Sequence, residues 1–151
     1  MVGSSGGSGT LPIPVRALID TNVVLDLLLA REPWASEAKP IWDARDDGRL
    51  EAYLPASVLT DIYYICRKQI GADPARAAIS ECLRRFIILA VDRGLLEAAL
   101  HVVGPDFEDD VQIVSAQASG MHLIVTRNAA DFVHGPIPTL TPSEVVARLS
   151  P

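Results

Sequence analysis

The sequence predicts an α/β fold in which helices cover both faces of an open, mostly parallel sheet. Short apolar runs of strand length alternate along the chain with longer segments whose apolar residues recur at the helical period. Such alternation is typical of parallel sheets, because a crossover helix has to join two strands that run in the same direction. A chain of 151 residues that is 49% hydrophobic has the size and apolar content of one domain. We expect a single domain over residues 13–151, preceded by a flexible Gly/Ser-rich leader over residues 1–12.

Four strands are expected from short, mostly apolar runs that end at or just before a polar residue or a proline. The first run is compatible with a strand that is buried on both faces, as central strands of parallel sheets are. In chain order, the expected strands are Val15 to Asp20, Ala52 to Leu54, Ile87 to Val91 and His122 to Thr126.

Helices are expected in the intervals between the strands, where apolar residues recur three and four positions apart. Gly71 and Gly120 are typical stop signals. Asp73 followed by Pro74 is a start signal, a side-chain cap and then a proline at the first helical position. Thr141, followed by a proline and an acid, is a similar start. In order, the expected helices run from Asn22, from about Trp34 to Gly48, from Ser57 to Ile70, from Asp73 to near Arg85, from Asp92 to about Val102, from Phe107 to Ala118, and from Thr141.

Composition excludes several classes of protein. No apolar run approaches the ~20 residues that cross a membrane, and the leader lacks the segments of a signal peptide, so we expect a cytoplasmic protein. The formal charge of -6 argues against a broad basic surface for nucleic acid, although not against an enzyme whose acidic centre first needs metal ions. Cys66 and Cys82 are expected to be buried free thiols. The three histidines are isolated in sequence, which leaves no zinc site.

Acidic residues recur where strands end and where helices begin. Asp20 lies at the carboxyl edge of the first strand, where active groups gather in open parallel sheets. Asp61 falls in the first turns of a helix, and Asn128 and Asp131 follow the last apolar strand. Three aspartates, with Glu108 among them, crowd the start of a later helix and are expected within an arc of roughly 100° on one side. These three are Asp106, Asp109 and Asp110.

Each of these acids also has a purely structural interpretation. An aspartate at a helix start accepts backbone N–H bonds, so Asp20 and Asp106 could both be caps. Asp61 could lie on a solvated helix face, and Asp26 is expected at the surface or in a turn. The joint pattern is more specific, because carboxylates that converge on one sheet edge raise one another's pKa unless cations lie among them. Oxygen-only ligands favour Mg²⁺ or Mn²⁺ as that cation.

Four segments, taken in this order and spacing, cover nearly the whole chain after the leader. They are "IDTNVVLDLL" at Ile19 to Leu28, "ASVLTDIYYICRK" at Ala56 to Lys68, "PDFEDDVQIVSA" at Pro105 to Ala116 and "LIVTRNAADF" at Leu123 to Phe132. Together they resemble the PIN domains, and in particular the ribonuclease toxins of VapBC toxin–antitoxin pairs. The resemblance implies a compact three-layer α/β/α sandwich and Mg²⁺- or Mn²⁺-dependent cleavage of RNA.

The resemblance implies a role for each matching residue. Asp20, Asp61 and Asp109 match the metal-binding acids, with Asp61 standing where the family usually has Glu. Asp106 matches an acid often found just before the third, and Asp131 is the candidate for the fourth. The carboxylate of Asp110 would be unusual, because this position is generally small and apolar. Polar residues at supporting positions are Thr21, Asn22, Thr126 and Asn128, the last of which is the alternative to Asp131.

The function implied is metal-assisted hydrolysis of an RNA phosphodiester, with one or two cations at the site. Arg127, Arg67 and Lys68 are candidate substrate-binding residues at its rim. The implied partners are the RNA substrate, a small antitoxin protein that covers the site, and a second copy of the chain in a homodimer.

Rival functions on a similar sheet are disfavoured by particular residues. A receiver domain needs a lysine after a late strand. The only lysines of this chain, Lys39 and Lys68, both lie early in the sequence. A haloacid-dehalogenase-type phosphatase needs an acid two residues after its nucleophile, and Asn22 stands there. A catalytically weak or inactive module that binds protein or RNA as a scaffold remains the alternative, because of the shorter Asp61 and the extra Asp110.

Overall fold

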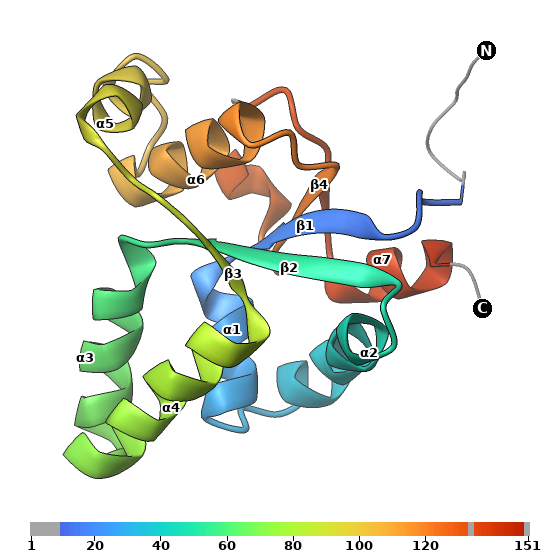
Figure 1. The fold of residues 1–151 in the computed structure, drawn as a ribbon, viewed down its shortest axis with the longest axis vertical. Coiled ribbons are helices and arrows are strands. Elements are labelled where there is room, and N and C mark those ends of the chain that lie inside the picture. The colour runs from blue at the N-terminus through green and yellow to red at the C-terminus, as the bar shows by residue number, and fades with distance from the viewer. Residues whose placement is uncertain (1–9, 133–134, 150–151) are drawn as a thin grey trace.

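The computed structural model describes residues 10–132 and 135–149. Its centre is a five-stranded sheet with the order β3-β2-β1-β4-β5, in which every neighbouring pair is parallel (Figure 1). The predicted α/β fold is therefore confirmed. Four strands lie where the sequence predicts them. The fifth strand has only two residues and was not predicted, because no apolar run marks it in the sequence. The strands are β1 (Val15–Ile19), β2 (Leu50–Pro55), β3 (Ile87–Leu89), β4 (Leu123–Val125) and β5 (Thr139–Leu140).

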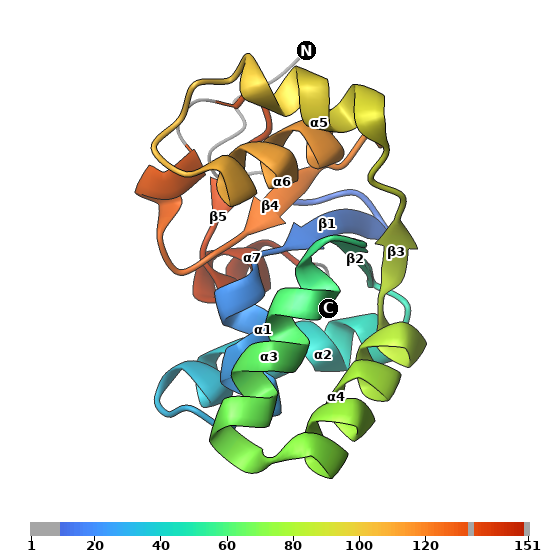
Figure 2. The same cartoon turned by 90° about the vertical axis from the view of Figure 1, so that its left-hand side faces the viewer.

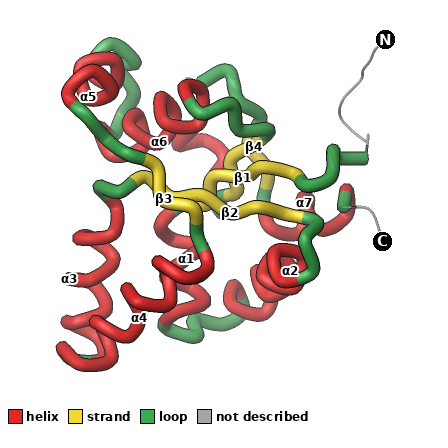
Figure 3. Tube along the Cα trace, viewed as in Figure 1, coloured by secondary structure: helices red, strands yellow, loops and turns green. Residues whose placement is uncertain are grey.

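Helices cover both faces of the sheet, as predicted. Figures 1 and 2 show α5 and α6 on one face and α1, α2, α3, α4 and α7 on the other. The colouring in Figure 3 makes the central strand layer visible between the two helical layers. The helices are α1 (Thr21–Leu28), α2 (Trp34–Asp46), α3 (Val58–Ile70), α4 (Ala72–Arg85), α5 (Arg93–Leu100), α6 (Phe107–Ala118), the 3₁₀ turn η2 (Ala129–Phe132) and α7 (Pro142–Arg148).

The central strand β1 contributes side chains to the cores of both layers. Val15, Ala17 and Ile19 belong to the larger apolar cluster, which includes residues of α1, α2, α3 and α4. Leu18 points the other way, into a smaller cluster that contains Ile113 of α6. This alternation follows from the two-residue period of a strand. It confirms that the first apolar run is buried on both faces, and it places Asp20 at the end of a fully covered strand.

The start of α4 differs from the prediction by two residues. The helix begins at Ala72, and Gly71 is its N-cap with φ of 93°. Because glycine adopts positive φ without a Cβ clash, the chain reverses directly from α3 into α4. Asp73 therefore lies inside the first turn, and no side chain caps the helix.

Several other expectations concern the ends of the chain and its class. No helix in residues 10–132 or 135–149 is long and apolar enough to span a bilayer. Cys66 and Cys82 are buried and free, as predicted. Residues 1–9 of the expected leader and His134 lie outside the described residues. The N–H group of Leu11 donates to the carbonyl of Arg148 at 3.1 Å, which ties the start of the described chain to α7.

Candidate active site

An acidic cavity of about 420 Å³ opens at the carboxyl edge of the sheet, where β1 ends and α1 begins. Its walls come from α1, α3 and α6, which can be followed in Figure 2. Five of the residues that line it carry carboxylates, and none of the described lining residues is Lys, Arg or His. The lining consists of Asp20, Thr21, Asn22, Leu25, Asp61, Tyr64, Ile65, Asp106, Glu108 and Asp109.

Asp20 is held by side chains from two other elements. It is 5% exposed. Its Oδ2 accepts a hydrogen bond of 2.9 Å from the Thr126 hydroxyl, and its Oδ1 accepts one of 3.3 Å from Nε2 of Gln112. Although Asp20 is the N-cap residue of α1 by position, its side chain makes no capping bond. The structural interpretation of Asp20 as a side-chain cap is therefore wrong, and its carboxylate is oriented from β4 and α6 instead.

The start of α6 brings three acids together. Oxygens of Asp106, Glu108 and Asp109 lie within 4.8 Å of one another, which is the spacing of groups that could share a metal ion. Asp106 also caps the helix, since its Oδ1 accepts from the N–H of Asp109 at 3.1 Å. The structural interpretation of Asp106 as a cap is therefore confirmed, and it is compatible with the functional one, because the cap uses only one of the two carboxylate oxygens.

Glu108 lines the cavity, although the sequence did not predict it as a site residue. Burial raises the pKa of its carboxyl group to about 8, assisted by a hydrogen bond with Asp61 and by the charges of Asp61, Asp106 and Asp109. The carboxyl group of Glu108 therefore reaches across from α6 to the acid on α3. The signal available in the sequence was its place between two aspartates, but a residue flanked by acids on a helix is ordinarily assigned to the surface.

The predicted supporting residues include one that binds Asp20 and two that line the cavity. Thr126 is fully buried and connects Asp20 to the N–H of Asn128, which donates to the Thr126 hydroxyl at 3.1 Å. Thr21 and Asn22 line the cavity, and the buried hydroxyl of Thr21 has no hydrogen-bond partner among the described residues. The side chain of Asn128 does not contribute to the cavity lining. The backbone of Asp131 lies in η2, but its side chain is outside the described part of the structure.

Asp110 departs from the expected arc of acids. It is 4% exposed and faces the interior, where its Oδ2 accepts a hydrogen bond of 3.1 Å from the N–H of Gly104. One residue along a helix turns the side chain by about 100°, so the step from Asp109 to Asp110 leaves the cavity. The expectation that all three aspartates share one side is wrong for Asp110, which anchors the preceding loop.

The three candidate substrate-binding cations are not part of the cavity lining. Arg127 is bound to Asp26, with Nε to Oδ2 at 2.8 Å and Nη2 to Oδ1 at 3.2 Å. Asp26 is 1% exposed, so the expectation of a surface residue is wrong. Arg127 and Arg31 both donate hydrogen bonds to this carboxylate, which compensates for its burial. Arg67 and Lys68 are exposed on α3, and only Lys68 falls on the same helix face as Asp61, seven residues earlier.

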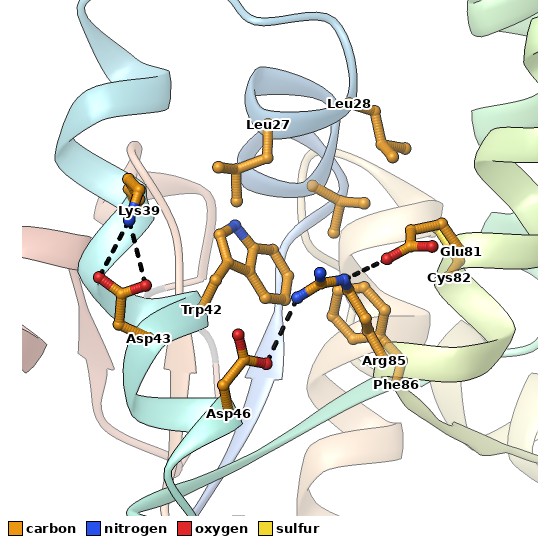
Figure 4. Close-up of a pocket in the computed structure, with 11 residues that line it drawn as sticks. Leu27, Leu28, Lys39, Trp42, Asp43, Asp46, Glu81, Cys82, Arg85 and Phe86 are labelled. Atoms are coloured by element: carbon orange, nitrogen blue, oxygen red, sulfur yellow. Dashed lines mark hydrogen bonds and ion pairs between the residues drawn. The ribbon is translucent and has the colours of Figure 1, made fainter.

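A second cavity of about 380 Å³ lies between α1, α2 and α4 (Figure 4). Its walls are mainly apolar, and Nε1 of Trp42 is a buried donor without a partner among the described residues. Ion pairs surround its mouth, with Lys39 bound to Asp43 at 3.2 Å and Arg85 bound to Asp46 and Glu81. The lining residues are Val24, Leu27, Leu28, Lys39, Trp42, Asp43, Asp46, Glu81, Cys82, Arg85 and Phe86.

Solved structures with this fold come from several bacteria. VapC20 of Mycobacterium tuberculosis, a toxin that cleaves the sarcin–ricin loop, is 18% identical with a TM-score of 0.66, and the match covers 77% of this chain and 92% of that one. A toxin–antitoxin complex from Klebsiella pneumoniae is 23% identical with a TM-score of 0.63, over 83% and 97% of the two chains. VapBC-1 of nontypeable Haemophilus influenzae is 12% identical with a TM-score of 0.64, over 85% and 99%. These identities are low, so the similarity concerns the fold.

Sequence comparison gives the family. No match was found among curated protein sequences. The family model of the PIN domain matches residues 16–130, which include all but the first residue of β1, all three walls of the acidic cavity and Thr126. The chain belongs to the PIN-domain family.

Proposed function

We propose that this protein is a Mg²⁺- or Mn²⁺-dependent endoribonuclease, and that it is the toxin of a VapBC-type toxin–antitoxin pair. The observation that carries the proposal is the convergence of five carboxylates on one cavity without a lysine, arginine or histidine in the described lining. Family membership supports the nuclease assignment. The toxins among the structural relatives support the narrower one.

The donor set fits a hard divalent cation. Mg²⁺ and Mn²⁺ prefer oxygen ligands, and carboxylates supply them here. Burial, and then the hydrogen bond with Asp61 and the charges of Asp61, Asp106 and Asp109, raise the pKa of Glu108, and a cation among these acids would favour its charged form. We propose that Asp20, Asp61 and Asp109 hold the ion, with Glu108 beside them. Asp106, and Asp131 as the sequence predicts, would assist a second ion or orient water.

The residues of the chain prepare the site in distinct ways. A bound divalent cation would polarise the scissile phosphate and lower the pKa of a coordinated water. Thr126 and Gln112 fix both oxygens of Asp20, so this ligand would not have to be ordered on binding. We propose that Lys68, which is exposed on the face of α3 that carries Asp61, meets the RNA backbone.

The aspartate at position 61, in place of the glutamate usual in the family, is compatible with an active enzyme. Asp61 has one methylene fewer than the Glu usual in the family. Glu108 hydrogen-bonds with Asp61 and lines the same cavity, so a longer carboxylate is supplied from the neighbouring helix. The extra acid Asp110 faces away from the cavity and adds no charge to its lining.

An antitoxin is proposed as the protein partner, since several structural relatives were crystallised as toxin–antitoxin complexes. The apolar cavity between α1, α2 and α4 is a suitable contact, because its unpaired Trp42 Nε1 would meet a hydrogen-bond acceptor of the partner (Figure 4). The test is capture of the product of a small neighbouring reading frame. Leu27→Glu should abolish capture, while Leu96→Glu on α5 should not. Light scattering of the free protein tests the proposed homodimer.

The nuclease is tested by incubating total RNA with the wild type and three variants in Mg²⁺, Mn²⁺ or EDTA. Asp20→Asn and Asp109→Asn should abolish discrete, metal-dependent products. Asp110→Asn is the matched control, because it lies next to Asp109 but outside the cavity, and its amide oxygen can still accept from Gly104. No cleavage by folded wild type in any buffer would favour the scaffold.

A further inference from the structure

A buried ionic cluster lies beside the acidic cavity, and the proposed chemistry does not use it. Asp26 of α1 is 1% exposed and binds two arginines. Arg127 contacts both of its oxygens, at 2.8 Å and 3.2 Å, and Nε of Arg31 contacts Oδ1 at 3.0 Å. The guanidinium carbon of Arg127 also lies 4.1 Å from the centre of the Trp34 ring. Arg127 is therefore fixed on two sides, by a carboxylate and by an aromatic face.

Arg127 sits in the chain segment that orients Asp20. Thr126, which precedes it, donates to Asp20 Oδ2 at 2.9 Å, and the N–H of Asn128, which follows it, donates back to the Thr126 hydroxyl at 3.1 Å. Asp26 lies six residues after Asp20, in the helix that starts directly after it. The contacts thus close a ring that runs from Asp20 to Thr126, along the chain to Arg127, across to Asp26, and back through α1.

We propose that Arg127 is a positioning residue of the acidic site, and that it acts through Thr126 on Asp20. This inference rests on the proposed nuclease function. The two-point contact with Asp26 fixes the segment after β4 to α1 and so holds the Thr126 hydroxyl against Asp20. The sequence alone predicted a substrate contact for Arg127. Two of its three guanidinium nitrogens, Nε and Nη2, instead bind Asp26 inside the protein.

Arg31 provides a matched control within the same cluster. It binds the same carboxylate and has a similar side-chain exposure, 35% against 29% for Arg127. A second hydrogen bond of its side chain goes to the carbonyl of Asn22, which is also in α1. Arg31 therefore contributes to the burial of Asp26 without connecting α1 to the segment that carries Thr126.

The test compares Arg127→Ala, Arg127→Lys and Arg31→Ala in RNA cleavage with saturating Mn²⁺, at a temperature where circular dichroism shows each variant folded. Loss of a group that hydrogen-bonds to a metal ligand typically lowers metal affinity or activity by about 10–100-fold. We expect kcat of Arg127→Ala to fall by about tenfold or more with KM nearly unchanged. Arg127→Lys, which keeps the charge but not the two-point contact, should recover part of the loss, and Arg31→Ala should keep kcat.

Each other outcome overturns the inference. A raised KM with unchanged kcat would make Arg127 a substrate contact. Equal losses of kcat in Arg127→Ala and Arg31→Ala would make the cluster merely structural. Should Arg127→Ala not fold, Arg127→Lys against Arg31→Lys gives the same comparison. Failure of the nuclease proposal is recognised separately, because the wild type itself would then not cleave RNA.

Discussion

The Thr126 hydroxyl donates a 2.9 Å hydrogen bond to Oδ2 of Asp20, across 106 positions of sequence. Both groups are buried, and both stand at the carboxyl ends of neighbouring parallel strands. The bond orients a carboxylate that has no capping role in its own helix. It is the contact through which the sheet prepares the acidic cavity.

Removing this hydroxyl should weaken both the fold and the metal site. Thr126→Val keeps the shape but removes the hydroxyl that binds Asp20 Oδ2 and the N–H of Asn128, and the loss of such hydrogen bonds costs about 1–3 kcal/mol. Urea unfolding should show a loss of that order, and Mn²⁺ should bind more weakly. Thr126→Ser retains the hydroxyl and should restore metal affinity. Equal Mn²⁺ affinity in the valine and serine variants would show that the bond does not prepare the site.

Metal affinity should rise with pH because of Glu108. Its carboxyl group, with a pKa of about 8 in the metal-free protein, carries a proton at neutral pH that a cation has to displace. Between about pH 6.5 and 8.5 the apparent affinity for Mn²⁺ should increase by about tenfold or more as that proton is lost. Calorimetry in buffers of different ionisation enthalpy would detect the released proton. In Glu108→Gln the pH dependence should be clearly flatter, and an unchanged slope would remove Glu108 from the site.

The carboxyl group of Glu108 should also make the metal-free protein less stable as the pH rises. The raised pKa means that the folded state binds a proton which the unfolded state releases at its ordinary, lower pKa. Without metal, stability from this residue is present below the unfolded pKa and is lost as the pH rises toward about 8. Melting temperatures in EDTA should fall over that range, and less so in Glu108→Gln. Equal slopes in the two proteins would contradict the assignment.

His122 should make the fold less stable in mild acid. Burial, together with the charge of Arg16, lowers the pKa of its imidazole, and its Nδ1 accepts the N–H of Arg16 at 2.9 Å. Below about pH 6.5 the unfolded chain therefore binds a proton that the folded protein resists, so stability declines as the pH falls. His122→Asn keeps an acceptor but does not titrate. The difference between wild-type and variant unfolding free energies should grow in acid, and a constant difference would exclude this role.

The parts of the site that could be predicted are those fixed by local pattern. The apolar run before Asp20 and the helix signals before Asp61 and Asp109 place these acids at strand ends and helix starts, and a parallel sheet brings such points together. Glu108 and Gln112 could not be recognised, because their roles depend on how α6 packs against β1, and Gln112 lies 92 positions from Asp20.

The burial of Asp26 and the strand β5 were not predicted for the same reason, because both depend on contacts between segments that are distant in the sequence. Asp26 is a single acid within an apolar helical pattern, and such an acid is ordinarily exposed to solvent. It is buried here because Arg31, which follows α1, and Arg127, which follows β4, both form ion pairs with it. β5 is only two residues long, so its pairing with β4, and not its own sequence, defines it as a strand.

The central claim is that the acidic cavity is a divalent metal centre, and Mn²⁺ calorimetry on the wild type, Asp20→Asn and Asp110→Asn tests it most directly. Both variants lose one buried carboxylate, but only Asp20 lines the cavity. We predict that the wild type and Asp110→Asn bind Mn²⁺ with similar affinity and that Asp20→Asn binds it at least about tenfold more weakly. Equal binding by all three proteins, or none by the wild type, would contradict the claim.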